Sequence, residues 1–189
     1  MTERELLIDC LQRLNRAELD YMLTGSMVSN YWGIPRSTHD LDFVIQLPPT
    51  AIPRLVEEFK SDFHLDDKAI HAAYQPPHQF NALDKRSALK VDFWLLQPQP
   101  FEREMFSRRL RVTLFGEPAY ICTAEDVILH KLYWHKLTPS DRQLSDAAGV
   151  VAVNGTTLDR IYLQKWAEFL QVPETLHSVL TGAIKPKHT

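Results

Sequence analysis

The chain has 189 residues, of which 44% are hydrophobic and 24% are charged, and its formal net charge is −3 at pH 7. This length and composition are typical of one globular domain with a real core, and the slightly negative charge argues against a broad electrostatic surface for nucleic acid. No apolar run approaches the roughly 20 residues that cross a bilayer, so we expect no membrane partner.

The first elements alternate between helix and strand. Apolar residues at three- and four-residue spacing predict an amphipathic helix over residues 2–16. The apolar run 21–24 predicts a buried strand that ends at Gly25, and Ser26 can cap the helix that follows. A second strand is expected over residues 40–47, before two consecutive prolines.

This second strand carries two acids on one face. Asp40 and Asp42 are two residues apart, so their side chains point the same way if both lie in the strand. Like charges side by side are costly unless a cation lies between them. Because hard divalent ions prefer oxygen ligands, the spacing predicts a Mg²⁺ site, for which Mn²⁺ is a possible substitute.

The remaining elements expected up to residue 122 are also a mixture of helices and strands. They are a helix over 50–59, a short helix with a loop within 63–79, a helix over 101–109, and hairpins of 80–83 with 88–96 and of 111–115 with 119–122. The strand of the first hairpin at 88–96 carries a single acid, Asp92.

From Thr123 onward the pattern changes to helices, with further helical segments expected over 139–153, over 158–170 and from Pro173. The sequence therefore predicts an α/β (α+β) fold. A mixed sheet flanked by helices forms a core over residues 1–122, and a helical segment over 123–189 packs on it and completes the same domain.

The predicted strands bring three carboxylates and a phosphate-binding turn close together. A helix that starts after a glycine turn exposes backbone N–H groups that favour phosphate. We expect the neighbouring strands to present Asp40, Asp42 and Asp92 beside this turn. Three carboxylates next to a phosphate-binding turn form the arrangement that two-metal phosphoryl transfer needs.

These residues also carry a resemblance to a known family. Gly25-Ser26, then the run 36–42 (Arg-Ser-Thr-His-Asp-Leu-Asp), then a later single Asp resemble the signature of the nucleotidyltransferase-fold (polymerase β-like) superfamily. The form Arg-x-Thr-x-Asp-x-Asp resembles the small bacterial branch related to AbiEii-type toxins and minimal nucleotidyltransferases. The helix from Thr123 to Lys131 and the later Asp146 are similar too, so the resemblance covers roughly residues 20–170.

The resemblance implies roles for individual residues. Asp40 and Asp42 would hold Mg²⁺, and Asp92 would complete the second metal site and help to deprotonate the acceptor hydroxyl. The nucleotide-binding residues that it implies are Gly25, Ser26, Arg36 and Lys131.

The resulting hypothesis is a Mg²⁺-dependent nucleotidyltransferase. It would move a nucleoside monophosphate from an NTP such as ATP to a hydroxyl of a protein, a tRNA or a small molecule. The alternative is a catalytically silent nucleotide- or partner-binding module of a toxin–antitoxin type system, with a cognate antitoxin as partner. The presence of all three carboxylates favours the enzyme.

A group of arginines and the two cysteines support only general expectations. A basic cluster either receives a polynucleotide acceptor or is a solvated helix face; its members are Arg103, Arg108, Arg109 and Arg111. Cys10 and Cys122 do not suggest a disulfide framework, and no signal peptide is recognisable. We therefore expect buried, reduced thiols in a cytoplasmic protein.

Overall fold

The computed structural model describes residues 1–187, so the last two residues of the predicted helical segment lie outside the described part. It divides the chain into two compact units. Unit 1 contains Met1–Thr24 and His39–Ile121, and unit 2 contains Gly25–Thr38 and the residues from Cys122 on. The prediction that 123–189 completes one domain with 1–122 stays a prediction.

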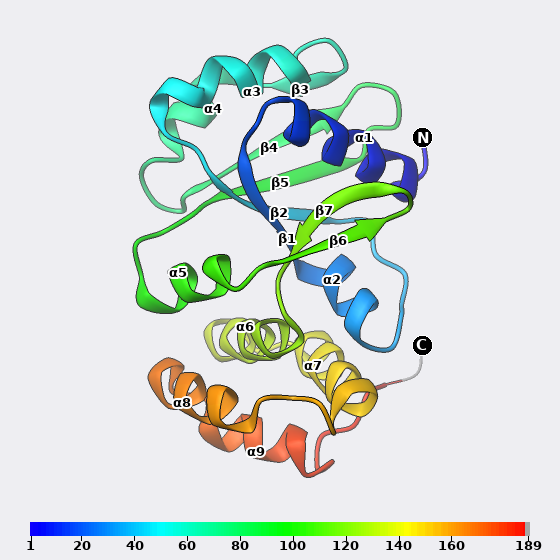
Figure 1. The fold of residues 1–189 in the computed structure, drawn as a ribbon, viewed down its shortest axis with the longest axis vertical. Helices are drawn as coiled ribbons and strands as arrows, with labels where there is room; N and C mark the ends of the chain where they lie inside the picture. The colour runs from blue at the N-terminus through cyan, green and yellow to red at the C-terminus, as the bar shows by residue number, and fades with distance from the viewer. Residues whose placement is uncertain (188–189) are drawn as a thin grey trace. The chain divides into compact units, whose positions relative to one another are not determined.

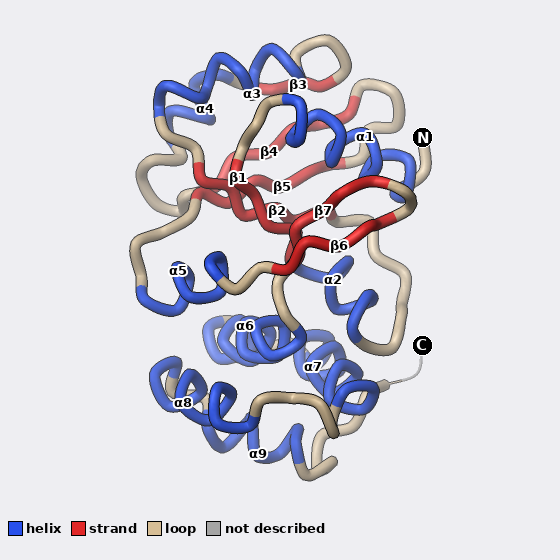
Figure 2. The backbone as a smooth tube through the Cα atoms, viewed as in Figure 1, coloured by secondary structure: helices blue, strands red, loops and turns tan. Residues whose placement is uncertain are grey.

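A mixed sheet forms the centre of unit 1, and Figure 2 shows its strands in red. In the described chain it has seven strands: β1 (Asp20–Thr24), β2 (Leu41–Gln46), β3 (Phe63–Leu65), β4 (Gln79–Asp84), β5 (Lys90–Leu95), β6 (Leu110–Leu114) and β7 (Glu117–Ile121). Their order is β3-β4-β5-β2-β1-β7-β6. The pairs β2–β5 and β1–β7 are parallel, and the other pairs are antiparallel. The predicted mixed α/β fold is confirmed.

One face of the central strands is apolar. Phe80 on β4, Phe93 on β5 and Phe43 on β2 stand directly beside one another in the register. We call these three buried side chains the phenylalanine cluster. The ring of Phe93 stacks on those of Phe43 and Phe80, with centroids 5.8 and 5.2 Å apart. Residues that alternate with this cluster along each strand point to the opposite face.

Helices complete unit 1 on both sides of the sheet, as Figure 1 shows for α1 and α3 on one side and α5 on the other. Their bounds are α1 (Glu3–Arg16), η1 (Pro49–Ala51), α3 (Ile52–Phe59), α4 (Asp67–Ala72) and α5 (Pro100–Ser107). A capping box fixes the start of α1, since Thr2 accepts a hydrogen bond from the Glu5 amide and the Glu5 side chain accepts one from the Thr2 amide.

Unit 2 is helical. It contains α2 (Gly25–Trp32), α6 (Ala124–Leu137), α7 (Asp141–Asn154), α8 (Arg160–Leu170) and α9 (Pro173–Leu180). Helices α2 and α7 pack closely where Gly33 follows α2, because a Cβ atom at Gly33 would lie 2.8 Å from the backbone nitrogen of Val150. A C-terminal helical segment is thereby confirmed. No helix of residues 1–187 is both long and apolar enough to span a bilayer.

Two local expectations were wrong. Strand β2 begins at Leu41, so Asp40 lies in the loop before the strand, and strand geometry does not align Asp40 with Asp42. Aspartate is a poor strand former, and the β2–β5 register begins at Leu41. Within 63–79 the structure has the strand β3 before the helix α4, because β4 supplies a partner for that short segment.

The phenylalanine cluster generates a stability prediction. Phe93→Ala should lower the free energy of unfolding by about 3–5 kcal/mol, because it removes a buried ring that is stacked on two others. Urea denaturation followed by circular dichroism measures this change. Phe115→Ala is the control, since Phe115 is half exposed and its loss should cost less than about 1 kcal/mol. Equal losses in the two variants would contradict the assignment of the core to this cluster.

Candidate functional site

Four polar side chains line up across neighbouring strands of unit 1. The register pairs Thr24 with Asp42, Asp42 with Asp92, and Asp92 with Asn81. Paired residues of adjacent strands point to the same face of a sheet, so these side chains form a polar row on the face opposite the phenylalanine cluster. We call them the acidic row. It brings Asp42 and Asp92, two predicted metal ligands, onto adjacent strands.

Asp92 is the most buried acid of this row, with 6% of its surface exposed. Its Oδ2 lies 2.8 Å from the Nζ of Lys90. Its Oδ1 is buried and has no hydrogen-bond partner among the described residues. A buried carboxylate oxygen without a partner costs free energy unless a donor or a cation reaches it. The side chain is therefore suited to receive a positive ion.

Asp40 lies at the exposed end of the loop that leads into β2. Its carboxylate nevertheless acts on the same lysine. The hydrogen bond to Asp92 raises the pKa of Lys90, partial burial opposes this, and the charges of Asp92, Asp40 and Asp42 raise it further. The three predicted acids thus share one neighbouring cation, Lys90, which the sequence reasoning did not assign.

The carboxylate oxygens of Asp42 and Asp92 in the acidic row fit a hard divalent cation, and Oδ1 of Asp92 lacks a partner among the described residues. Within residues 1–187, however, no three side chains of the metal-binding types His, Cys, Asp and Glu form a group arranged to hold a metal ion. Asp42 and Asp92 are adjacent in the register, while Asp40 lies outside the strand. Metal binding by Asp40, Asp42 and Asp92 stays a prediction.

In unit 2, the predicted phosphate-binding residues meet around a single acid, Asp146 on α7. The Nε and Nη2 atoms of Arg36 donate to Oδ1 and Oδ2 of Asp146 at 2.7 and 2.8 Å. The Nζ of Lys131 donates to Oδ2 at 2.8 Å, and Nη2 of Arg36 also donates to the Oγ of Ser26 at 2.8 Å. Two cations and one anion leave this group with one net positive charge, which suits a phosphate ligand.

Asp146 is buried, with 8% of its surface exposed. Burial raises the pKa of this carboxyl, but the hydrogen bond from Arg36 and the charge of Lys131 outweigh it, so the pKa of Asp146 lies below its ordinary value. The acid is therefore ionised at neutral pH and holds Arg36 and Lys131 in fixed positions.

The backbone around Arg36 and Gly25 is also fixed. The side-chain amide of Asn30 donates to the Arg36 carbonyl at 2.7 Å and accepts from the Arg36 amide at 3.1 Å. Gly25 has φ = 67°, a left-handed conformation that favours glycine. The Oγ of Ser29 donates to the Gly25 carbonyl at 3.0 Å. These contacts explain why the segment between β1 and β2 needs a glycine and an asparagine.

The sequence reasoning missed Lys90 and Asn30, and it named Asp146 as part of the family resemblance without assigning it a role in the site. Lys90 stands two residues before Asp92 on the same strand, and this spacing is the signal that places both on one face. The role of Asp146 depends on contacts 110 and 15 residues away, which no local pattern reveals.

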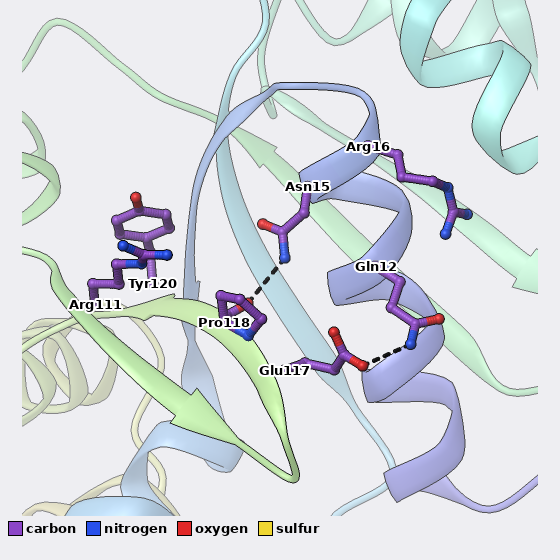
Figure 3. A pocket seen from close by; sticks show the side chains of 7 residues that line it. All are labelled: Gln12, Asn15, Arg16, Arg111, Glu117, Pro118 and Tyr120. Atoms are coloured by element: carbon purple, nitrogen blue, oxygen red, sulfur yellow. Dashed lines mark hydrogen bonds between the residues drawn. The ribbon is translucent and has the colours of Figure 1, made fainter.

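None of these residues lines the cavity of about 440 Å³ in unit 1, whose lining side chains are drawn in Figure 3. Helix α1 and strands β6 and β7 line it. The side chain of Gln12 donates to Glu117 at 2.7 Å, and that of Asn15 donates to the Pro118 carbonyl at 3.0 Å. Arg16, on the same wall, is paired with Glu58. Because these polar groups already bind protein partners, we assign the cavity no ligand.

The remaining residues of interest have structural roles. In the basic cluster, Arg109 pairs with Asp20 at 2.8 Å and packs over the ring of Phe106. Cys10 and Cys122 are buried, as predicted. Burial raises the pKa of the Cys10 thiol, so this side chain is protonated and inert at neutral pH.

Comparison with known proteins identifies the fold. The chain superimposes on an antigenic nucleotidyltransferase-like protein from Paracoccidioides brasiliensis with a TM-score of 0.60 and 17% identity, covering 98% of this chain and 94% of that one. It matches ANT(2'')-Ia in complex with adenylyl-2''-tobramycin with a TM-score of 0.59 and 12% identity, covering 90% and 98%. The solution structure of the antibiotic-resistance factor ANT(2'')-Ia gives 0.54 and 13%, covering 95% and 94%.

The chain therefore has a nucleotidyltransferase-like fold, and the predicted fold class is confirmed. No protein-family model matches the sequence, and no curated protein matches it either. At these identities the comparisons establish the fold alone, so the AbiEii-related branch stays a prediction.

Asp146 generates the second prediction. Asp146→Asn should destabilise unit 2 by about 3 kcal/mol at pH 7, because the buried Lys131 and the partly buried Arg36 lose their counter-ion. The pKa of Asp146 is lower in the folded chain than in the unfolded chain. Its stabilising contribution is therefore complete above about pH 3.9, the ordinary value, and is lost as the pH falls through the folded value.

Thermal unfolding of wild type and variant between pH 7 and pH 2.5 measures this effect, and the two curves should converge on acidification. Asp141→Asn is the control, since Asp141 is an exposed acid of the same helix that pairs with Lys187. A stability difference that is independent of pH would show that Asp146 does not act through its charge.

Proposed function

We propose that the protein is a Mg²⁺-dependent nucleotidyltransferase that transfers a nucleoside monophosphate from an NTP to a hydroxyl of an acceptor. The observation that carries this proposal is the acidic row of unit 1. Asp42 and Asp92 stand side by side on parallel strands of a nucleotidyltransferase-like fold, and Oδ1 of Asp92 is buried without a hydrogen-bond partner in the described chain. Two adjacent carboxylates of this kind are expected to repel unless a cation joins them.

The residues that would hold Mg²⁺ are Asp42 and Asp92, together with Asp40 from the loop before β2. When bound, Mg²⁺ would neutralise phosphate charge and favour ionisation of the acceptor hydroxyl. Asp92 would accept the proton of that hydroxyl. The acceptor oxygen then forms a bond to the α-phosphorus, the bond between the α-phosphorus and the bridging oxygen breaks, and pyrophosphate leaves with the electron pair.

The proposed phosphate ligands lie in unit 2. Ser26, Arg36 and Lys131 surround Asp146 with one net positive charge, and Gly25 permits close approach of a phosphate to the backbone. Because Asp146 fixes Arg36 and Lys131 before any ligand arrives, little side-chain entropy is lost when a triphosphate binds.

The fold comparison indicates which class of acceptor to test first. ANT(2'')-Ia, which shares the fold, is known in complex with adenylyl-2''-tobramycin, so a small-molecule hydroxyl is the first acceptor class to test and ATP the first donor. Protein and tRNA acceptors remain candidates. The Arg-x-Thr-x-Asp-x-Asp form supports the AbiEii-related branch, in which a cognate antitoxin would be a partner. The presence of only two cysteines, both buried, supports a cytoplasmic location.

The acidic row generates the central prediction. Asp42→Asn and Asp92→Asn should each lower nucleotide transfer on the order of 10³-fold or more while the protein remains folded, since the metal ligands would be lost. To measure transfer, wild type and each variant are incubated with cell extract and each α-labelled NTP. Labelled RNA, protein and small molecules are then separated. Pyrophosphate release is recorded in parallel.

Asp20→Asn is the matched control, because Asp20 is an exposed acid on β1 that pairs with Arg109. Undiminished transfer by the Asp42 and Asp92 variants would refute the catalytic proposal. Metal-dependent NTP binding without any transfer by wild type would instead support the silent binding module.

Lys131 generates a separate prediction for the nucleotide. Lys131→Gln should raise the KM for the NTP by about tenfold or more, because one charge-assisted phosphate contact is lost. Steady-state kinetics with the labelled NTP measures it. The control is Lys136→Gln on the same helix, since the exposed Lys136 donates to Leu170 and Gln171 instead. An unchanged KM in the Lys131 variant would remove this residue from the nucleotide site.

A further inference from the structure

The acidic row already has a cation beside it, the ammonium group of Lys90. Lys90 and Asp92 are two residues apart on β5, so both side chains project from the same face of the sheet. The Lys90 Nζ lies 2.8 Å from Oδ2 of Asp92. Lys90 thus supplies positive charge at the side chain that the proposed metal ion would use.

The two partners differ in their freedom to move. The side chain of Asp92 is 9% exposed, whereas that of Lys90 is 47% exposed. A lysine has a flexible four-carbon stem and a strongly hydrated head group, so Lys90 can withdraw into solvent while Asp92 stays in place. Its ion pair is consequently weak compared with a fully buried pair.

A divalent cation and the lysine have conflicting requirements at Asp92. A bound cation would use the carboxylate oxygens of Asp92, and its two positive charges would repel an ammonium at hydrogen-bond distance from the same carboxylate. In the absence of the cation, the ammonium lessens the repulsion between Asp42 and Asp92, which adjacent strands hold side by side. Even with the ammonium on Oδ2 and a cation on Oδ1, the two positive charges would face each other across one carboxylate, so each disfavours the other at Asp92.

We propose that Lys90 is a built-in counter-ion of the acidic row, which must withdraw from Asp92 before a divalent cation binds there. This inference rests on the proposed function, because it concerns the same carboxylates. It goes beyond that function in assigning a second state to the site. The lysine holds the row together without metal and competes with the metal for Asp92.

Mn²⁺ binding to the nucleotide-free protein tests the competition directly. Lys90→Gln and Lys90→Met both remove the competing charge, and Lys90→Met keeps most of the length of the side chain. Each variant should bind Mn²⁺ on the order of fivefold tighter than wild type, as measured by calorimetry and by electron paramagnetic resonance of free Mn²⁺. Thermal unfolding confirms that each variant is folded.

Two control variants test whether a change in Mn²⁺ affinity is due to the charge of Lys90. Lys90→Arg keeps the positive charge next to Asp92 and should bind Mn²⁺ within about twofold of wild type. Lys60→Gln removes an exposed lysine of unit 1 that pairs with Glu57 away from the row, and should also bind as wild type does. A tighter site only in the two Lys90 variants without charge supports the counter-ion role.

The possible failures are distinguishable. If wild type binds Mn²⁺ and the two uncharged Lys90 variants bind it equally or more weakly, Lys90 is not a competitor, and the proposed metal-dependent function stands without it. If neither wild type nor these variants bind Mn²⁺, both the counter-ion and the metal-dependent function are overturned. Tighter binding by Lys60→Gln of the same size would attribute the effect to net charge alone and would also overturn the inference.

Discussion

The parallel pairing of β2 with β5 is the constraint on which the candidate chemistry depends. Its register sets Phe43 beside Phe93 on one face and Asp42 beside Asp92 on the other. Burial of the phenylalanine rings stabilises the pairing, and the same register forces two carboxylates together. The cost of this juxtaposition is offset by Lys90 in the described structure, and a divalent cation would offset it more completely.

The charges of the site in unit 2 are reversed: one acid lies between two cations, whereas in unit 1 one cation lies beside two acids. The single buried acid of unit 2, Asp146, holds two cations that come from distant parts of the chain. Removing either cation would leave the acid with one partner, whereas removing the acid would leave the buried Lys131 and the partly buried Arg36 without a counter-ion. The carboxylates of unit 1 suit metal ions, and the cations of unit 2 suit phosphates. Nucleotidyl transfer needs both kinds of group.

Most of the fold was predictable because its patterns are local. The strands predicted over 40–47 and 88–96 correspond to β2 and β5, because each is a short run of mostly apolar residues that can be recognised locally. The helices of the C-terminal segment were predicted from apolar spacing and capping residues. By contrast, β3 has three residues and exists because β4 pairs with it, so its own sequence carried too little signal.

The candidate site was predictable only in part, for the same reason. Asp42, Asp92, Ser26, Arg36 and Lys131 were selected from motifs, and the structure gives them partners that no motif contains. The exit of Asp40 from the strand is decided by where the β2–β5 register begins. The convergence of Arg36 and Lys131 on Asp146 is decided by tertiary packing, in which Gly33 permits close contact between α2 and α7.

The most direct test of the account is a crystal structure of the protein soaked in Mn²⁺, with anomalous scattering used to locate the ion. The account predicts an anomalous peak at bonding distance from the carboxylates of Asp42 and Asp92, with the Lys90 ammonium withdrawn from Asp92. An Asp92 that still pairs with Lys90, with no peak at the acidic row, would contradict it.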